Sequence, residues 1–164
     1  MLVLVVVVAV LALDQATKAW ALTALRDDVI PIVPTLELRL AFNSGFSFGM
    51  GAEYGPLVAV VVLVITALLA RAALRERHLP RALLFAAILG GALGNIVDRV
   101  VRADAGPLSG SVVDFIAVTW YAVFNIADMF VVCGAVLLVL VDLRRDRRER
   151  RAGVVDAEAG PEAA

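Results

Sequence analysis

The sequence has very few of the residues that commonly bind metals or form disulfides. Its 164 residues include one cysteine, Cys133, and one histidine, His78. A lone cysteine excludes an internal disulfide, and these two residues together are too few for a His/Cys zinc site. We interpret Cys133 as a packing residue and His78 as a solvated loop residue. We expect neither a metal nor any other cofactor.

Charged residues are also scarce, at 19% of the chain, whereas hydrophobic residues make up 62%. The mean hydropathy is +0.91. Soluble domains are about 45–50% apolar, and a soluble fold of this size could not bury so much additional apolar surface. The chain is therefore predicted to be an integral membrane protein, with membrane lipids and not nucleic acid as its partners.

Four apolar segments predict four transmembrane helices. The first has no charge through Leu13, and we interpret it as a membrane helix because it lacks the basic start and the clear cleavage site of a signal peptide. The third is short, about 24 Å at 1.5 Å per residue, and Arg81 and Arg99 flank it. The four segments are 1–25, 56–74, 82–97 and 123–143.

The segment between the first two predicted helices has a different pattern. In "LELRLAF" at 36–42, leucines alternate with Glu37 and Arg39, which is typical of a half-buried strand. Pro31 and Pro34 are expected to end this strand upstream, and glycines from Gly45 onward are expected to end it downstream. We therefore predict a mainly α integral membrane protein with a small sheet outside the membrane.

The distribution of arginine predicts the orientation. Four arginines lie in and around the loop after the second predicted helix, and six follow the fourth. Because arginine-rich loops stay in the cytoplasm, both termini are expected on the cytoplasmic side. Residues 144–164 are charged and then rich in alanine, glutamate and glycine, so we predict a disordered cytoplasmic tail after a membrane domain at 1–143.

With this topology, polar residues from separate segments reach one level near the outer face of the membrane. Ionisable groups at membrane depth are costly, so their convergence indicates a function. A structural ion pair is the alternative for Asp14 and Lys18, which lie one helical turn apart. An interface anchor is the alternative for Asp98 and Arg99, and a helix cap for Asn125. The converging residues are Asp14, Lys18, Asn43, Asp98, Arg99, Asp114, Asn125 and Asp128.

Asp114 and Asp128 suggest a specific chemistry. A continuous helix would hold them about 21 Å apart, so they can meet only if the chain folds back before the last helix. Two neighbouring carboxylates share a proton, because like charges at short range disfavour double ionisation. The ionised member can then take a proton from water, while the protonated member polarises a carbonyl and later protonates the leaving group. This chemistry hydrolyses an amide without a covalent intermediate.

Three other functions remain open at this stage. A Ser–Lys dyad would have to use Lys18, the only lysine. A proton- or ion-coupled transporter also needs buried acids, although these should lie near the middle of the membrane. A membrane adaptor would need neither aspartate.

Five short motifs follow one another along the chain. They are "DQATK" at 14–18, "NSGFSFG" at 43–49, "GGALGNIVDR" at 90–99, "VVDF" at 112–115 and "FNIAD" at 124–128. In these motifs, over roughly residues 2–143, the chain resembles the lipoprotein signal peptidase (signal peptidase II) family of bacterial aspartyl peptidases. Ser47 stands where that family usually has alanine, a difference that concerns packing beneath the substrate and leaves the two catalytic segments unchanged.

The resemblance implies four transmembrane helices with an outer β-cradle, in the inner membrane of a bacterium, and a site near the outer face. The implied substrate is a prolipoprotein whose cysteine already carries diacylglycerol, cut just before that cysteine. We expect the enzyme to act as a monomer. Asp114 and Asp128 would be the catalytic pair. The residues implied to bind substrate or support the site are Asn43, Gly45, Asn95, Asp98, Arg99, Asn125, Asp14 and Lys18.

Overall fold

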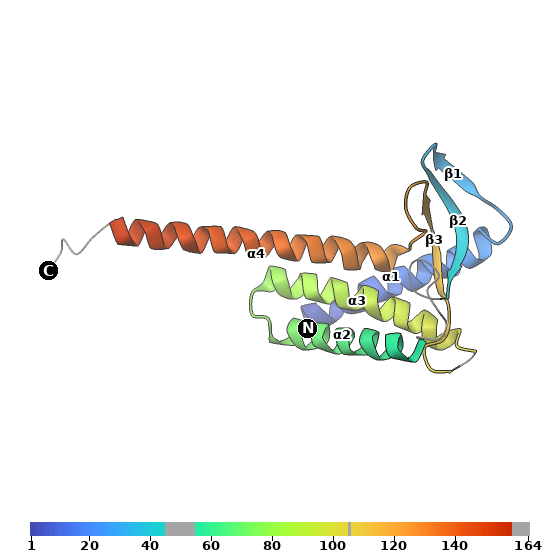
Figure 1. Ribbon diagram of the computed structural model, residues 1–164, viewed down its shortest axis with the longest axis horizontal. Helices are drawn as coiled ribbons and strands as arrows, with labels where there is room; N and C mark the ends of the chain where they lie inside the picture. The colour runs from blue at the N-terminus through green and yellow to red at the C-terminus, as the bar shows by residue number, and fades with distance from the viewer. Residues whose placement is uncertain (45–54, 105, 159–164) are drawn as a thin grey trace.

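Helices dominate the fold, and a small sheet lies across one end of them (Figure 1). The structure is a computed structural model that describes residues 1–44, 55–104 and 106–158, without the side chains of 55–59 and 148–158. The N-terminus and the far end of the last helix both lie away from the sheet. The elements are α1 (Leu2–Ala24), β1 (Ile30–Val33), β2 (Leu36–Asn43), α2 (Gly55–Arg75), α3 (Leu79–Val101), β3 (Val112–Val118) and α4 (Ile126–Glu158).

Three helices in the described part of the chain are long and apolar enough to cross a membrane. These spans are Leu2–Ala24, Leu79–Val101 and Ile126–Arg147. Large apolar side chains on them point outward and are exposed, among them Leu4 on α1 and Val132 and Val136 on α4. In water such surface would be unfavourable, whereas in lipid it is the expected exterior. The chain is therefore a membrane protein.

The third helix is longer than the sequence predicts. Its 23 residues would measure about 34 Å, and Arg81 and Arg99 lie inside it instead of flanking it. Pro80 occupies the first turn, where a missing backbone N–H costs nothing. At the other end the helix continues through Asp98, because the protein supplies partners for its polar side chains. The polar residues therefore do not mark the helix boundary.

The last helix also differs from the prediction. It begins at Ile126, three residues later than predicted, and continues through Glu158, so residues 144–158 are helical where we predicted disorder. Arginine and glutamate favour helix, and neither glycine nor proline interrupts the segment before Gly153. Figure 1 shows that this extension runs past the ends of the neighbouring helices. The division into a membrane domain and a separate tail stays a prediction.

The predicted strand is confirmed as β2, the central strand of an antiparallel sheet with the order β1-β2-β3. Its leucines alternate as predicted: Leu38 and Leu40 pack against a cluster on α1 and β3, while Glu37 and Arg39 form an exposed ion pair. This strand begins at Leu36, after both prolines, as predicted, but Pro31 lies within a further strand, β1, that sequence analysis did not predict. β1 is an edge strand, where a residue without an N–H is tolerated.

Two glycines of α3 let the neighbouring helices come close. A Cβ on Gly94 would collide with the Asp14 carboxylate of α1, and one on Gly91 would lie 2.6 Å from the Ala127 carbonyl oxygen at the start of α4. These glycines thus allow α3 to pack tightly against both the inner polar residues of α1 and the first turn of α4. This packing brings the polar residues together.

Candidate active site

Asp114 reaches the interior from the sheet. It lies on β3, opposite Ala41 of β2, and only 2% of its side chain is exposed. Sequence analysis did not predict this strand, although its partner β2 was predicted. The strand is buried along most of its length and packs against α1, with Phe115 edge-to-face on Trp20.

The chain folds back between Asp114 and Asp128, as the sequence analysis required. After β3 it turns at Trp120 and Tyr121 and returns, so that Ile116 pairs with Phe124 in an isolated bridge. Helix α4 begins immediately afterwards. This return brings the start of α4 beside the middle of β3 instead of the 21 Å away that a helix would impose.

Asn125 and Asp128 cap the start of α4 reciprocally. The Asn125 side-chain oxygen accepts the Asp128 N–H at 3.0 Å, and the Asp128 carboxylate accepts the Asn125 N–H at 3.2 Å. Such a capping box satisfies amides that a helix start would otherwise leave unbonded. The capping role that sequence analysis kept open for Asn125 is therefore confirmed, and it fixes which way the amide of Asn125 faces.

The same asparagine bonds to the other aspartate. Because its oxygen faces the Asp128 N–H, its NH₂ group faces inward and donates to the Asp114 carboxylate at 2.6 Å. It also lies 3.3 Å from the Val113 carbonyl oxygen. Asn125 is fully buried. It therefore joins Asp114 and Asp128 through one rigid amide.

Asn95 of α3 holds Asp128 from the other side. Its NH₂ group donates to the Asp128 carboxylate at 2.8 Å, and its oxygen accepts a hydrogen bond from the Lys18 ammonium at 2.8 Å. An ammonium can only donate, so the Asn95 oxygen must face Lys18 and the amide must face Asp128. The orientation of a second amide is thus fixed by its neighbours.

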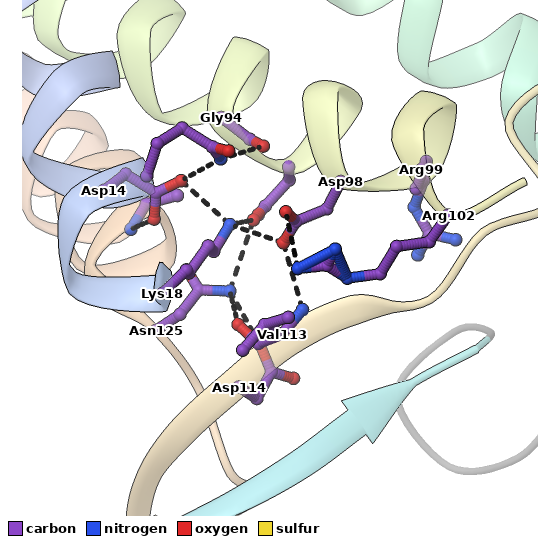
Figure 2. Close-up of polar contacts among 12 residues, drawn as sticks. Asp14, Lys18, Gly94, Asp98, Arg99, Arg102, Val113, Asp114 and Asn125 are labelled. Atoms are coloured by element: carbon purple, nitrogen blue, oxygen red, sulfur yellow. Dashed lines mark hydrogen bonds and ion pairs between the residues drawn. The ribbon is translucent and has the colours of Figure 1, made fainter. Parts of the chain in front are cut away.

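Lys18 lies between two buried carboxylates, as Figure 2 shows. Its ammonium is 2.8 Å from the Asp14 carboxylate on the same helix and 3.1 Å from the Asp98 carboxylate on α3. The predicted pair one helical turn apart therefore exists, and α3 contributes a further partner. Buried ions need such pairing because an unpaired charge is very unfavourable inside a protein.

Arg99 and Asn43 lie at the edge of the site. The Arg99 guanidinium is 3.4 Å from the Gly110 carbonyl oxygen and interacts electrostatically with Asp114 and Asp128. Asn43 is the last residue of β2 and hydrogen-bonds to Asp114. Gly45, which the resemblance also implies, lies outside the described residues.

Burial raises the pKa of Asp114 from its usual 3.8 to about 6. The negative charge of Asp128 raises it further, whereas hydrogen bonds from Asn125 and Asn43 and the charge of Lys18 oppose the shift. A carboxyl group with a raised pKa beside a second carboxylate is the arrangement in which two acids share one proton.

Sequence analysis missed two polar contacts beside this site. Gln15 donates to the Gly94 carbonyl at 3.1 Å, and Arg102 lies 3.8 Å from the Asp98 carboxylate. The position of Arg102, four residues after Asp98, was a usable signal because such residues share a helix face. Gln15 lies in the "DQATK" motif, but its partner could not be predicted, because that partner is a backbone carbonyl on α3.

The described residues offer no obvious metal site. Among them, no three His, Cys, Asp or Glu side chains are grouped so that they could hold a metal ion. Asp14 and Asp98 instead share Lys18, and Asp114 and Asp128 accept hydrogen bonds from amides. The geometry is suited to proton transfer between two acids that fixed amide donors hold in place.

Comparisons with known proteins identify the family of this chain. The family described as Signal peptidase (SPase) II matches residues 6–144. A lipoprotein signal peptidase from Mycobacterium avium is 42% identical over 87% of this chain and 79% of its own length, and one from Bifidobacterium adolescentis is 38% identical over 83% and 73%. The chain matches half the length of the Streptomyces coelicolor lipoprotein signal peptidase, at 42% identity over 62% of this chain.

The fold is also similar to solved structures. A bacterial membrane enzyme determined by the in meso method at 2.3 Å resolution has a TM-score of 0.73 and 26% identity, covering 88% of each chain. A second such structure, at 1.9 Å, has a TM-score of 0.72 over 86% of this chain and 91% of its own. The chain belongs to the signal peptidase II family, the aspartic peptidases that remove signal peptides from prolipoproteins.

Proposed function

We propose that Asp114 and Asp128 are the catalytic pair that cuts a prolipoprotein just before its diacylglyceryl-modified cysteine. The observation that carries the proposal is the Asn125 side chain, which bonds to the Asp114 carboxylate and to the backbone N–H of Asp128. One buried amide thus holds both acids at the same place. The raised pKa of Asp114 supports the sharing of one proton between them.

The mechanism follows from that shared proton. One carboxylate is ionised and takes a proton from a water molecule, which attacks the scissile carbonyl carbon. The other is protonated and donates a hydrogen bond to the carbonyl oxygen, where negative charge develops. The acid that was protonated at the start then gives its proton to the leaving amine. The other acid keeps the proton taken from water, so the pair again holds one shared proton. Asn95 and Asn125 keep the two acids fixed during these steps.

The remaining proposed residues surround this pair. The guanidinium of Arg99 and the amide of Asn43 are close enough to bind the substrate backbone or to stabilise developing negative charge. Gly45 lies two residues after Asn43 and is proposed to allow close approach of the substrate chain. Asp14, Lys18 and Asp98 lie behind the pair and do not reach the scissile bond.

We also propose a location and an orientation. The chain spans the inner membrane of a bacterium four times, with α2 as the fourth span, and acts as a monomer among lipids. Its arginine-rich loop after α2 and its C-terminal end lie in the cytoplasm, which places the sheet and the aspartate pair at the outer face. A signal peptide still embedded in the membrane would present its cleavage point at that level.

Thiol labelling tests the orientation. In a Cys133→Ala background, a cysteine at the exposed Ala103, between α3 and β3, should react with an impermeant thiol reagent added to intact cells. A cysteine at the exposed His78, between α2 and α3, should react only after the cells are opened. Labelling in the opposite pattern would place the aspartate pair on the cytoplasmic side and contradict the proposed orientation.

Truncation tests whether the end of the proposed tail is dispensable. Ending the chain after Arg151 keeps the arginines that set orientation and removes residues 152–164, including the last turns of α4, which extend past the other helices (Figure 1). Cleavage activity should stay at the full-length level. A well-inserted truncated protein that has lost activity would give the C-terminal segment a role beyond a dispensable tail.

Chelation tests whether the two acids work without a metal. Lys18 and Arg99 already place positive charges beside the pair, which disfavours a bound divalent cation. EDTA should therefore leave the cleavage rate unchanged. A loss that a divalent cation restores would indicate a metal bridging Asp114 and Asp128.

The decisive experiment uses purified protein in proteoliposomes. Incubation with a diacylglyceryl-modified prolipoprotein should release its signal peptide, and the same prolipoprotein without the lipid should be cut far more slowly. Measurement of proton flux in the same vesicles addresses the transporter alternative. Flux without cleavage would overturn the proposed function.

A further inference from the structure

The Lys18 ammonium makes three contacts, which equals the number of its protons. Its acceptors are Asp14 and Asp98, already described, and the Asn95 oxygen at 2.8 Å. Only 1% of the Lys18 side chain is exposed. A buried lysine with every proton bonded is held in one geometry, because no water competes for its donors.

Each of the two carboxylates paired with Lys18 also accepts a backbone N–H. The second oxygen of Asp14 accepts the N–H of Ala127 at 3.0 Å. The Asp98 oxygen nearest Lys18 accepts the N–H of Val113, also at 3.0 Å (Figure 2). Both carboxylates are charged acceptors, and such hydrogen bonds are stronger than neutral ones.

The two amides have a common position relative to the proposed catalytic pair. Ala127 directly precedes Asp128, and Val113 directly precedes Asp114. Each bonded N–H lies in the peptide bond just before the one that enters the aspartate, so anchoring it fixes the backbone one residue upstream and restricts where the aspartate can lie. The third contact of Lys18 acts on the Asp128 carboxylate itself, through Asn95.

We propose that Asp14, Lys18 and Asp98 are positioning residues that set the placement of Asp114 and Asp128 relative to each other. Asp14 holds the start of α4, and Asp98 holds the start of β3. Lys18 bonds to both carboxylates and so fixes their positions relative to each other. This inference rests on the proposed function of the aspartate pair. It assigns to the buried ions a role in the reaction beyond packing α1 against α3.

Buried ions suit this positioning role better than apolar side chains would. β3 and α4 meet through a short return of the chain, and a displacement of about 1 Å between reacting groups can cost about 10²-fold in rate. One cation between two carboxylates, each bonded to a rigid amide, links α1, α3, β3 and α4 at a single point. Apolar packing could bury this volume but could not fix the direction of the amides.

Hydrogen exchange resolved to single amides tests the arrangement in the full chain. Asp14→Ala should speed exchange at Ala127 and leave Val113 protected, whereas Asp98→Ala should do the reverse. Lys18→Met should deprotect both amides. A general loss of packing would raise exchange at both sites in all three variants, so equal deprotection in the two aspartate variants would overturn the inference.

Kinetics give a second test on variants that stay folded. Asp14→Ala and Asp98→Ala should each lower kcat about 10²-fold with KM unchanged, because the pair is displaced while the groups that bind substrate remain. Asp14→Asn and Asp98→Asn should lose less, because the asparagine oxygen can still accept the N–H. If the alanine variants fail to fold, these asparagine variants carry the test through a reduced kcat and faster exchange at the corresponding amide.

The matched control is Thr17→Val. Thr17 is the neighbour of Lys18 on α1, and its hydroxyl bonds only to carbonyls of its own helix in the described contacts. Its kcat and its exchange at Ala127 and Val113 should equal those of the wild type. Folded alanine variants with wild-type kcat would overturn the positioning role. If the wild type failed to cleave the prolipoprotein, in contrast, the proposed function itself would be overturned.

Discussion

Asp114→Asn and Asp128→Asn are each expected to lower cleavage by at least about 10²–10⁴-fold, the range for lost acid–base catalysis. Asparagine has nearly the shape of aspartate, and its oxygen can keep the bonds from Asn125 or Asn95 that hold the native side chains. It can neither take a proton from water nor give one to the leaving group. The chemical step should therefore fail while substrate still binds.

The double variant should be little worse than either single variant. Two groups that perform one proton transfer act as a unit, so removing the second costs almost nothing once the first is gone. The measurements are single-turnover cleavage rates and substrate affinity for the two single variants and the double variant. Multiplicative losses would instead indicate that the two aspartates act independently.

Asp104→Asn is the matched control for this series. Asp104 is an exposed aspartate after α3, and its carboxylate accepts a hydrogen bond from the Ser109 hydroxyl. The variant should cleave at the wild-type rate. If either Asp114→Asn or Asp128→Asn kept the rate of this control, or lost activity only through unfolding, the two acids would not be the catalytic pair.

Much of the site could be predicted from the sequence because membrane-level polar residues are so costly. In a chain that is 62% hydrophobic, Asp14, Lys18 and Asp98 are conspicuous, and the arginine pattern predicts that they lie at one level. The structure brings them together, with Lys18 paired to both acids. The alternation of leucines in β2 likewise identified a strand because one face is buried.

The parts of the fold and site that the sequence did not predict depend on partners that are distant in sequence. β3 is buried on both faces along much of its length, so "VVDFIAV" does not alternate and gives no strand period. The N–H groups of Val113 and Ala127 bond to carboxylates 15 and 113 residues away. No local pattern encodes such bonds, because any residue has a backbone N–H. The polar side chains could therefore be selected from the sequence, whereas their geometry required the fold.

Asp114→Asn is also expected to stabilise the protein at pH 7, by up to about 3 kcal/mol, although it abolishes cleavage. Burial beside Asp128 raises the pKa of Asp114 from 3.8 to about 6. Ionising this group in the folded protein is therefore less favourable than ionising it in the unfolded chain. Asparagine avoids that cost, because it stays neutral at every pH.

The direction of the pH dependence follows from which state binds more protons. Between pH 3.8 and about 6, folded Asp114 holds its proton while the unfolded chain has released it. Stability that depends on Asp114 is therefore present below pH 3.8, is lost as the pH rises to about 6, and changes no further above that. Subtracting the stability-versus-pH curve of Asp114→Asn from that of the wild type removes the contributions of all other groups that titrate equally in both proteins.

Thermal unfolding in detergent between pH 4 and pH 8 measures this difference. The two proteins should unfold at nearly the same temperature at pH 4, and Asp114→Asn should unfold at the higher temperature from about pH 6 upward. Asp104→Asn should follow the wild type throughout, because Asp104 is exposed. A constant gap across the whole range would show that Asp114 does not titrate differently in the folded protein. The stability cost of placing two acids side by side would then have to arise from Asp128 alone.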